Sequence, residues 1–253
     1  MGGALTVRID VRDLDVVRGR SLAVRGVTLE ARPGEWLGIV GANGSGKTSL
    51  LRAVAGRIEV AGGGIAINGV DVTTDRASRA RIVGFAPEAG LLPDSLVPGQ
   101  LFSLLAGRQH HLEEDRDLAQ LRTALGIAAL LDRRISTLSS GNRQRIAIYA
   151  AFVASAPRQA VILDEPFNWL DPVCAYDLKI ALSGLVVKGL TLITALHDLA
   201  SWAMLCDHGT LLADGAVAAD LAAAELIEGR RNIPCFEQNI IGKLGRPNVA
   251  PLP

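Results

Sequence analysis

The stretch GANGSGKT, at positions 41 to 48, decides the fold of this 253-residue chain. It fits the pattern G-x-x-x-x-G-K-[ST], in which a glycine-rich loop turns its backbone amides toward phosphate groups. The flanking residues supply the context that this pattern needs. EWLGIV, at 35 to 40, predicts a buried strand before the loop, and GKTSLLRAVAGR, at 46 to 57, predicts an amphipathic helix after it. We therefore predict a phosphate-binding loop between a strand and a helix.

Each residue type of this loop has a role in holding a phosphate chain. The glycines let the backbone approach the phosphates, Lys47 brings a positive charge to the terminal phosphates, and the Thr48 hydroxyl can join a magnesium ion. The residues that we expect to bind the nucleotide are Gly41, Asn43, Gly44, Ser45, Gly46, Lys47, Thr48 and Ser49.

A second segment supplies the carboxylates that a magnesium–nucleotide site needs. AVILDEP, at 160 to 166, reads as an apolar strand that delivers Asp164 and Glu165 at its carboxyl end. Ligands of parallel sheets bind at that edge. We expect Asp164 to belong to the magnesium shell and Glu165 to polarise an attacking water molecule.

The order of predicted elements indicates an α/β fold. Short strands and an Asn-Gly hairpin in residues 5 to 72 predict an N-terminal antiparallel β subdomain. Residues from about 88 to 156 read as an inserted α-helical subdomain, after which strands and helices alternate again. Such alternation favours a mostly parallel sheet with flanking helices. We assign residues 1–228 to one nucleotide-binding domain and expect an irregular tail over 229–253.

Composition narrows the function classes. Lysine plus arginine equals aspartate plus glutamate, 26 each, so no overall charge attracts nucleic acid, and none is expected as a partner. The longest uncharged apolar run, at 146 to 156, is shorter than the ~20 residues of a membrane-spanning helix. The cysteines Cys174, Cys206 and Cys235 fit neither a zinc site nor a disulfide framework, which favours a reducing cytoplasm.

LSSGNRQR, at 138 to 145, contains the ingredients of a second anion site: two hydroxyls, a glycine and the free amides of a helix start. Taken alone, it is typical of an ordinary serine-capped helix. One chain of this size has no evident need for two phosphate sites, so the segment requires another explanation.

The motifs together supply that explanation. GANGSGKT, LSSGNRQR, AVILDEP, NWLD and the lone His197 resemble, in order and spacing, the ATP-binding subunit of ABC transporters over roughly residues 5 to 225. The resemblance implies a P-loop NTPase-type fold, ATP and Mg²⁺ as cofactors, and ATP hydrolysis. It also implies that the second anion site completes the nucleotide site of a partner chain in a head-to-tail dimer. The residues implied in that contact are Ser139, Ser140, Gly141 and Asn142.

The same resemblance gives roles to two more residues. His197 would contact the γ-phosphate and hold Glu165 and the water in line. Asp171, in NWLD, would couple the two sites across the dimer. It also stands where an N-cap is expected for a helix beginning at Pro172, and both roles are compatible.

Three positions depart from the family pattern. Glu88 replaces a glutamine that usually binds magnesium and water; it could still ligate the metal, and similar glutamates occur in some export-type subunits, which favours export. Asn142 replaces a glutamine in the signature loop. Arg18 stands where an aromatic residue usually stacks on adenine. Either its guanidinium stacks on the base instead, or it is a surface arginine.

The resemblance implies a motor subunit that lies peripherally on the cytoplasmic face of the cell membrane. Its partners would be a second ABC ATPase subunit, identical or not, and integral membrane permease subunits. A coupling helix of the permease would dock on residues from about Glu88 to Leu105, where Leu91, Leu92 and Leu96 are expected to be exposed.

Two other function classes remain open at this point. One is a soluble ABC-type ATPase without a transport role, such as an iron–sulfur cluster assembly ATPase. The other is a binding-only regulator with a defective site, against which the intact Lys47, Asp164, Glu165 and His197 argue.

Overall fold

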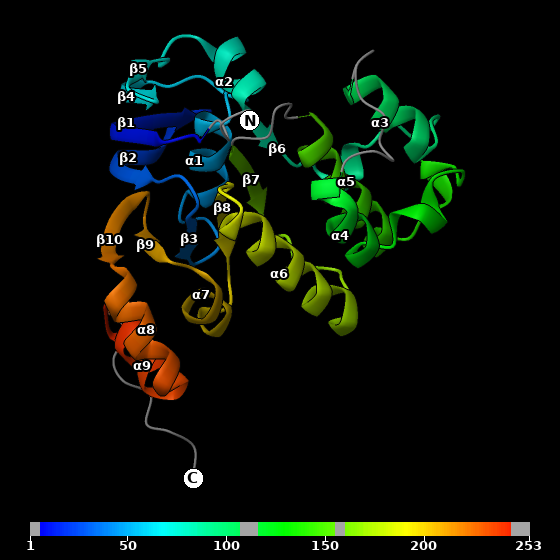
Figure 1. Ribbon diagram of the computed structural model, residues 1–253. Helices are drawn as coiled ribbons and strands as arrows, with labels where there is room; N and C mark the ends of the chain where they lie inside the picture. The colour runs from blue at the N-terminus through cyan, green and yellow to red at the C-terminus, as the bar shows by residue number, and fades with distance from the viewer. Residues whose placement is uncertain (1–5, 107–115, 155–159, 244–253) are drawn as a thin grey trace.

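Two sheets form the body of the molecule, for which a computed structural model describes residues 6–106, 116–154 and 160–243 (Figure 1). The larger sheet has the strand order β10-β9-β3-β8-β7-β6. Its neighbours run parallel except for β10, which pairs antiparallel with β9. The strands are β3 (Trp36–Gly41), β6 (Val83–Phe85), β7 (Ala160–Asp164), β8 (Thr191–Leu196), β9 (His208–Ala213) and β10 (Ala216–Leu221).

The central strands are buried on both faces, which explains their continuous apolar sequence. All six residues of β3 and of β8 are buried. Alternate side chains of β3 belong to different cores: Trp36 and Val40 pack toward the helices, whereas Leu37 and Ile39 pack toward α1 and the smaller sheet. The larger sheet is therefore the middle layer of the molecule.

The smaller sheet is antiparallel, with the order β2-β1-β4-β5. Asn68 and Gly69 both have positive φ, 50° and 78°, between β4 and β5, as a two-residue Asn-Gly hairpin requires. The predicted antiparallel element is thus confirmed, and its strands are longer than the apolar runs suggested. They are β1 (Ile9–Arg18), β2 (Ser21–Ala31), β4 (Gly62–Ile67) and β5 (Val70–Asp71).

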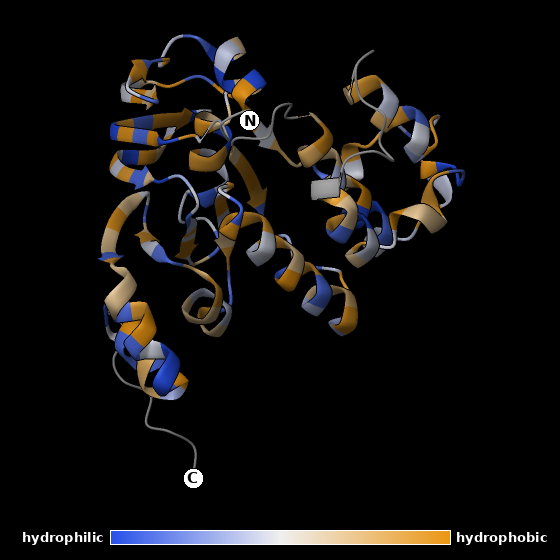
Figure 2. Ribbon diagram, viewed as in Figure 1, coloured by the Kyte–Doolittle hydropathy of each residue, from blue (hydrophilic) through white to orange (hydrophobic). Residues whose placement is uncertain are grey.

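Helices cover the sheets and form a block to one side of them (Figure 1). The block, between Glu88 and Ala154, contains α3, α4, α5 and short 3-10 turns. In Figure 2, α6 carries hydrophobic colour along most of its length, and it has apolar residues on its exposed side (Val173, Tyr176, Ile180 and Val187) as well as on its buried side. The helices are α1 (Lys47–Val54), α2 (Arg76–Ile82), α3 (Pro98–Ala106), α4 (Arg116–Ala124), α5 (Ser140–Ala154), α6 (Pro172–Val187), α7 (Leu199–Leu205), α8 (Ala223–Arg231) and α9 (Ile233–Lys243).

The expectation of an irregular tail over 229–253 is wrong for its described part. Residues up to Arg231 end α8, and α9 occupies Ile233–Lys243 beside it (Figure 1). Phe236 and Ile240 are one helical turn apart and both buried. The ring of Phe236 lies 6.0 Å from that of Trp202 on α7. Tertiary packing therefore stabilises a helix that the sequence pattern did not reveal. Across the described residues, every helix is too short or too polar to span a bilayer.

Candidate active site

Three neighbouring strands bring the predicted site residues to one edge of the larger sheet. Strands β3, β8 and β7 are adjacent and parallel. Gly41 is the last residue of β3, Asp164 is the last residue of β7, and His197 directly follows β8. Because the carboxyl ends of parallel strands meet at one edge, the phosphate loop, the acidic pair and the histidine converge there.

The phosphate loop depends on its glycines for two different reasons. Gly44 and Gly46 have φ values of +84° and +99°, a left-handed conformation that suits glycine. At Gly41 the reason is space, because an added Cβ would lie 2.3 Å from the carbonyl oxygen of Leu212. Asn43 is exposed in the turn, and Ser49 lies in the first turn of α1.

Lys47 is folded into the loop that precedes it. Its Nζ donates hydrogen bonds to the carbonyl oxygens of Gly41 (2.7 Å) and Ala42 (3.1 Å). Burial lowers the pKa of Lys47, and the nearby carboxylates of Glu165 and Asp164 oppose that change. The ammonium group therefore lies beside the site, and phosphate oxygens could replace the two carbonyl oxygens as its hydrogen-bond acceptors.

Thr48 and Asp164 form a pair suited to magnesium. The Thr48 hydroxyl donates to Asp164 Oδ2 at 2.7 Å, while Asp164 Oδ1 is buried without a hydrogen-bond partner. Burial raises the pKa of Asp164, partly offset by the hydrogen bond from Thr48. A hard divalent cation prefers such oxygen ligands and would stabilise the buried carboxylate, so these residues fit Mg²⁺.

Glu165 is held on both of its carboxylate oxygens. Its backbone has φ of +51°, and its N–H donates to the carbonyl oxygen of Ala195 at 3.2 Å. His197 pairs with Oε1, and Asn168 Nδ2 donates to Oε2 at 2.7 Å. A glutamate in this sparsely populated conformation is an observation that points to function. Sequence reasoning found the histidine and missed Asn168, which only its position three residues after Glu165 could have suggested.

The signature segment, Ser139 to Asn142, lies at the start of α5. Ser139 Oγ accepts a hydrogen bond from the Asn142 N–H at 3.3 Å, and both Ser139 and Ser140 are exposed. A Cβ at Gly141 would lie 2.6 Å from the carbonyl oxygen of Trp169, so glycine is needed for this close approach. The hydroxyls are therefore displayed at the surface beside the loop that follows Glu165.

Asp171 caps α6, as one of its two expected roles requires. Its side chain accepts from the Cys174 N–H at 2.9 Å and forms an ion pair with Arg145 of α5. The hydrogen bond from Cys174 is the main reason why the pKa of Asp171 is lowered. The partner Arg145 lies in the LSSGNRQR segment and had no predicted role.

Glu88 pairs with Arg52 of α1 rather than with Thr48 or Asp164. Both members of the pair line a cavity of about 380 Å³ that Asp164 and Glu165 also line. Glu88 therefore lies at the catalytic cavity with its charge neutralised. Arg52 follows Thr48 by one helical turn, and this spacing is the sequence signal that could have placed Arg52 near the site.

Arg18 ends β1 and is exposed, lining a shallow hollow with Arg57 and Arg76. The start of β2 is close to the phosphate loop, because a Cβ on Gly46 would lie 2.4 Å from the carbonyl oxygen of Ala23. Arg18 itself lies with the residues that follow α1, since Arg57, Ile58 and Glu59 line the same hollow.

A groove of about 490 Å³ lies beside the catalytic cavity, between the Glu88 loop and helices α3 and α5. Leu91 is 75% exposed at its rim. Leu92 was expected to be exposed as well, but it is 4% exposed because it packs into the core of the helical block. Leu96 is half-buried against the same core.

Comparison with known proteins identifies the family. The family model described as ABC transporter matches residues 24–168. The hemin import ATP-binding protein of Pseudomonas entomophila is 32% identical over 215 residues, covering 82% of this chain and 84% of that protein. The cytochrome c biogenesis ATP-binding export protein of Aromatoleum aromaticum is 35% identical over 193 residues, covering 76% and 89%.

A solved ATP-binding subunit of an ABC transporter has the same fold, with a TM-score of 0.80 at 25% identity over 94% of this chain and 99% of that one. The family-model match over residues 24–168 includes the phosphate loop, the acidic pair and the signature segment. This chain therefore belongs to the ABC transporter family and is an ATP-binding, ATP-hydrolysing cassette.

Proposed function

We propose that this chain is the motor subunit of a membrane transporter, and that it closes head-to-tail with a second ABC ATPase subunit around two Mg²⁺-ATP molecules. In this proposal the chain lies on the cytoplasmic face of the membrane and drives integral membrane permease subunits. The observation that carries it is the display of exposed Ser139 and Ser140 hydroxyls by a chain whose own phosphate loop already pairs with Asp164 through Thr48. A second copy would use those hydroxyls.

The chemistry follows from the residues of the sheet edge. The loop amides and Lys47 would bind the phosphates, and Thr48 and Asp164 would hold Mg²⁺, which supplies charge neutralisation at the phosphates. Glu165 would orient a water molecule and accept its proton as the water oxygen bonds to the γ-phosphorus. The bond to the ADP oxygen breaks, giving ADP and phosphate. His197 supports Glu165, to which it is already paired.

Closure of the dimer would convert binding into motion. The serines of each copy would meet the γ-phosphate bound by the other, so the closed state is stabilised only while both nucleotides bridge the interface. Hydrolysis removes the bridge and favours reopening. Asp171 caps α6 and pairs with Arg145 of α5, so a movement at the nucleotide site would reach α5 through this ion pair.

The groove supports a permease as partner. Its apolar wall includes Leu91, Leu101 and Leu105, of which Leu91 and Leu105 are exposed, and Glu88 and Arg52 lie between it and the catalytic cavity. An apolar, open groove of this size suits a short amphipathic helix from another chain. A partner seated there would touch the Glu88 loop directly.

The transporter proposal is favoured over a soluble cluster-assembly ATPase because the similar proteins named above act in transport. The expectation of export, drawn from Glu88, gains no such support, since those relatives are named for hemin import as well as for export. We therefore assign direction to the permease chains rather than to this subunit.

The first test is a trapped dimer. Glu165→Gln removes the proton acceptor but keeps the shape of the side chain, so we expect hydrolysis to fall by about 10²–10⁴-fold. With Mg²⁺-ATP, this variant should elute as a dimer in light scattering. A Glu165→Gln chain that remains monomeric at saturating Mg²⁺-ATP would overturn the head-to-tail arrangement.

The second test concerns the membrane partner. The tagged chain, extracted from native membranes in mild detergent, should co-purify with a stoichiometric multi-span protein. Leu91→Asp places a charge on the exposed wall of the groove and should release that protein, whereas Ile241→Asp, at an exposed site on α9, should not. Recovery of soluble partners alone would favour the cluster-assembly class.

A further inference from the structure

The ion pair between Arg52 and Glu88 forms a wall between two cavities. Both residues line the catalytic cavity, together with Asp164 and Glu165, and both also line the neighbouring groove. The Arg52 side chain is mostly buried, with 22% of its surface exposed, whereas Glu88 is 54% exposed. The arginine is thus the buried member of the pair and the glutamate the more exposed one.

Charge explains why Glu88 needs a partner. The cavity already contains the carboxylates of Asp164 and Glu165, and bound ATP would add several negative charges. A third carboxylate at its edge repels phosphate unless a cation compensates for it. Arg52 is near enough to act on the whole cluster: after burial, the Thr48 hydrogen bond, Glu165 and Lys47, its charge also influences the pKa of Asp164.

The placement of Arg52 is set by its helix. It follows Thr48 by four residues on α1, so both side chains lie on the same helix face. The loop that begins at Glu88 is held from its other side by Arg143 of α5, which pairs with Asp94 and donates to the carbonyl oxygen of Ala89 at 3.4 Å. Glu88 is therefore the point where this loop is anchored to the sheet side of the molecule.

We propose that Arg52 is a positioning residue for nucleotide binding, which neutralises Glu88 and keeps its carboxylate from facing the γ-phosphate unpaired. The proposal rests on the Mg²⁺-ATP site described above. Its consequence is conditional: Arg52 is required because residue 88 is a glutamate. If Glu88 is made neutral, Arg52 becomes dispensable for nucleotide affinity.

A double-mutant cycle tests this condition by calorimetry with Mg²⁺-ATP and Mg²⁺-ADP. For Arg52→Gln, we expect the Kd for ATP to rise about tenfold, as one uncompensated charge near the phosphates would cause, and the Kd for ADP to rise less. Arg52→Gln/Glu88→Gln should return the ATP affinity to within about twofold of the unsubstituted chain. Arg52→Lys, which keeps the charge, should bind ATP nearly normally.

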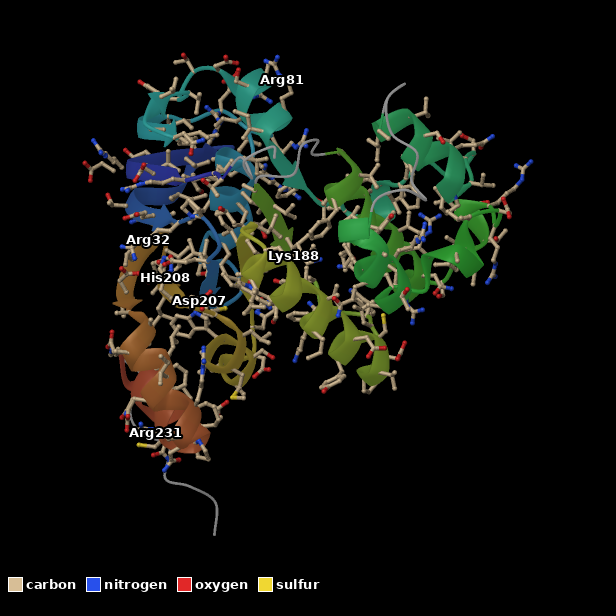
Figure 3. The ribbon with its side chains drawn as sticks, in the orientation of Figure 1. Arg32, Arg81, Lys188, Asp207, His208 and Arg231 are labelled. Atoms are coloured by element: carbon tan, nitrogen blue, oxygen red, sulfur yellow. The ribbon has the colours of Figure 1, made fainter. Side chains whose placement is uncertain are left out.

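Two controls separate this role from a structural one. Arg32→Gln removes a more exposed ion-paired arginine, bound to Glu30 at 2.9 Å, which directly follows β2 and lies near His208 (Figure 3). It should leave ATP binding unchanged. If the double variant loses as much affinity as Arg52→Gln alone, Arg52 only supports the fold, and the proposal is wrong; unchanged affinity in Arg52→Gln would refute it as well.

Lys47→Ala distinguishes failure of this proposal from failure of the site itself. Suppose that Lys47→Ala loses ATP binding, but the Arg52 and Glu88 variants all bind ATP with the affinity of the unsubstituted chain. That result would reject only the positioning role. ATP binding that survives Lys47→Ala would instead reject the assignment of the phosphate loop, on which the cycle depends.

Discussion

Substitution of Gly141 by alanine tests how closely the signature helix is packed against the loop that follows Glu165. An added Cβ would lie 2.6 Å from the carbonyl oxygen of Trp169, whereas ordinary contacts begin at 3.4 Å. The two backbones must therefore separate by about 0.8 Å, the difference between those distances. Neither atom belongs to a flexible side-chain end, so rotation of a side chain cannot relieve the contact.

The free energy of unfolding should fall as a result. Overpacking of this kind costs typically about 1–3 kcal/mol. Alanine in a helix returns about 0.5–1 kcal/mol relative to glycine. We therefore expect a net loss of up to about 2.5 kcal/mol for Gly141→Ala. Gly242→Ala in α9 is the matched control, because a Cβ there meets nothing within 4 Å and should stabilise slightly.

Hydrolysis should report the same displacement. The loop that carries Trp169 also carries Asn168, which holds Glu165 Oε2. We expect kcat to fall at least about tenfold, as small misplacements of catalytic groups do. ATP affinity of the monomeric chain should stay unchanged, because Gly141 lies against the Trp169 loop and not against the phosphate loop of its own chain. Urea denaturation, calorimetry and phosphate release measure these three quantities. A Gly141→Ala chain as stable and as active as Gly242→Ala would refute the reasoning.

Two further predictions concern charge. The pKa of Asp164 is raised above 3.8 by burial, so its ionised form destabilises the free chain as pH rises through the raised pKa. Asp164→Asn should therefore unfold at a higher urea concentration than the unsubstituted chain at neutral pH, and this difference should vanish below pH 3.8. The same variant should lose Mg²⁺-dependent hydrolysis. Equal urea midpoints at neutral pH would contradict the stability prediction. For Arg18→Ala we expect ATP affinity to fall about two- to fivefold if the guanidinium stacks on adenine. Unchanged affinity would identify Arg18 as a surface arginine.

Motifs that act locally could be predicted from the sequence. The phosphate loop, the acidic end of β7 and the helix from Pro172 to Val187 each follow from a pattern of neighbouring residues. The Asn-Gly hairpin and the serine at the start of α5 are of the same kind. Each pattern is formed by residues that are neighbours in the sequence, so it can be recognised before the tertiary contacts around it are known.

Features that depend on tertiary contacts were missed. Arg52 and Glu88 are 36 residues apart, and Arg145 and Asp171 are 26 apart, so no local pattern reveals that they pair. Leu92 looked like an exposed loop residue but packs into a core that only the folded helical block creates. The helix α9 is stabilised by packing against α7 and α8, and its own sequence does not reveal those contacts.

The loop between Glu165 and Asp171 is tied to the active site and to the signature helix at once. At its start, Asn168 holds the catalytic carboxylate, and at its end Asp171 pairs with Arg145. Between them, the loop backbone lies against Gly141. In the proposed dimer, a partner bound at the exposed start of α5 would lie beside the loop that positions Glu165. In the proposed dimer, we therefore expect hydrolysis to depend on the partner's contact as well as on the bound nucleotide.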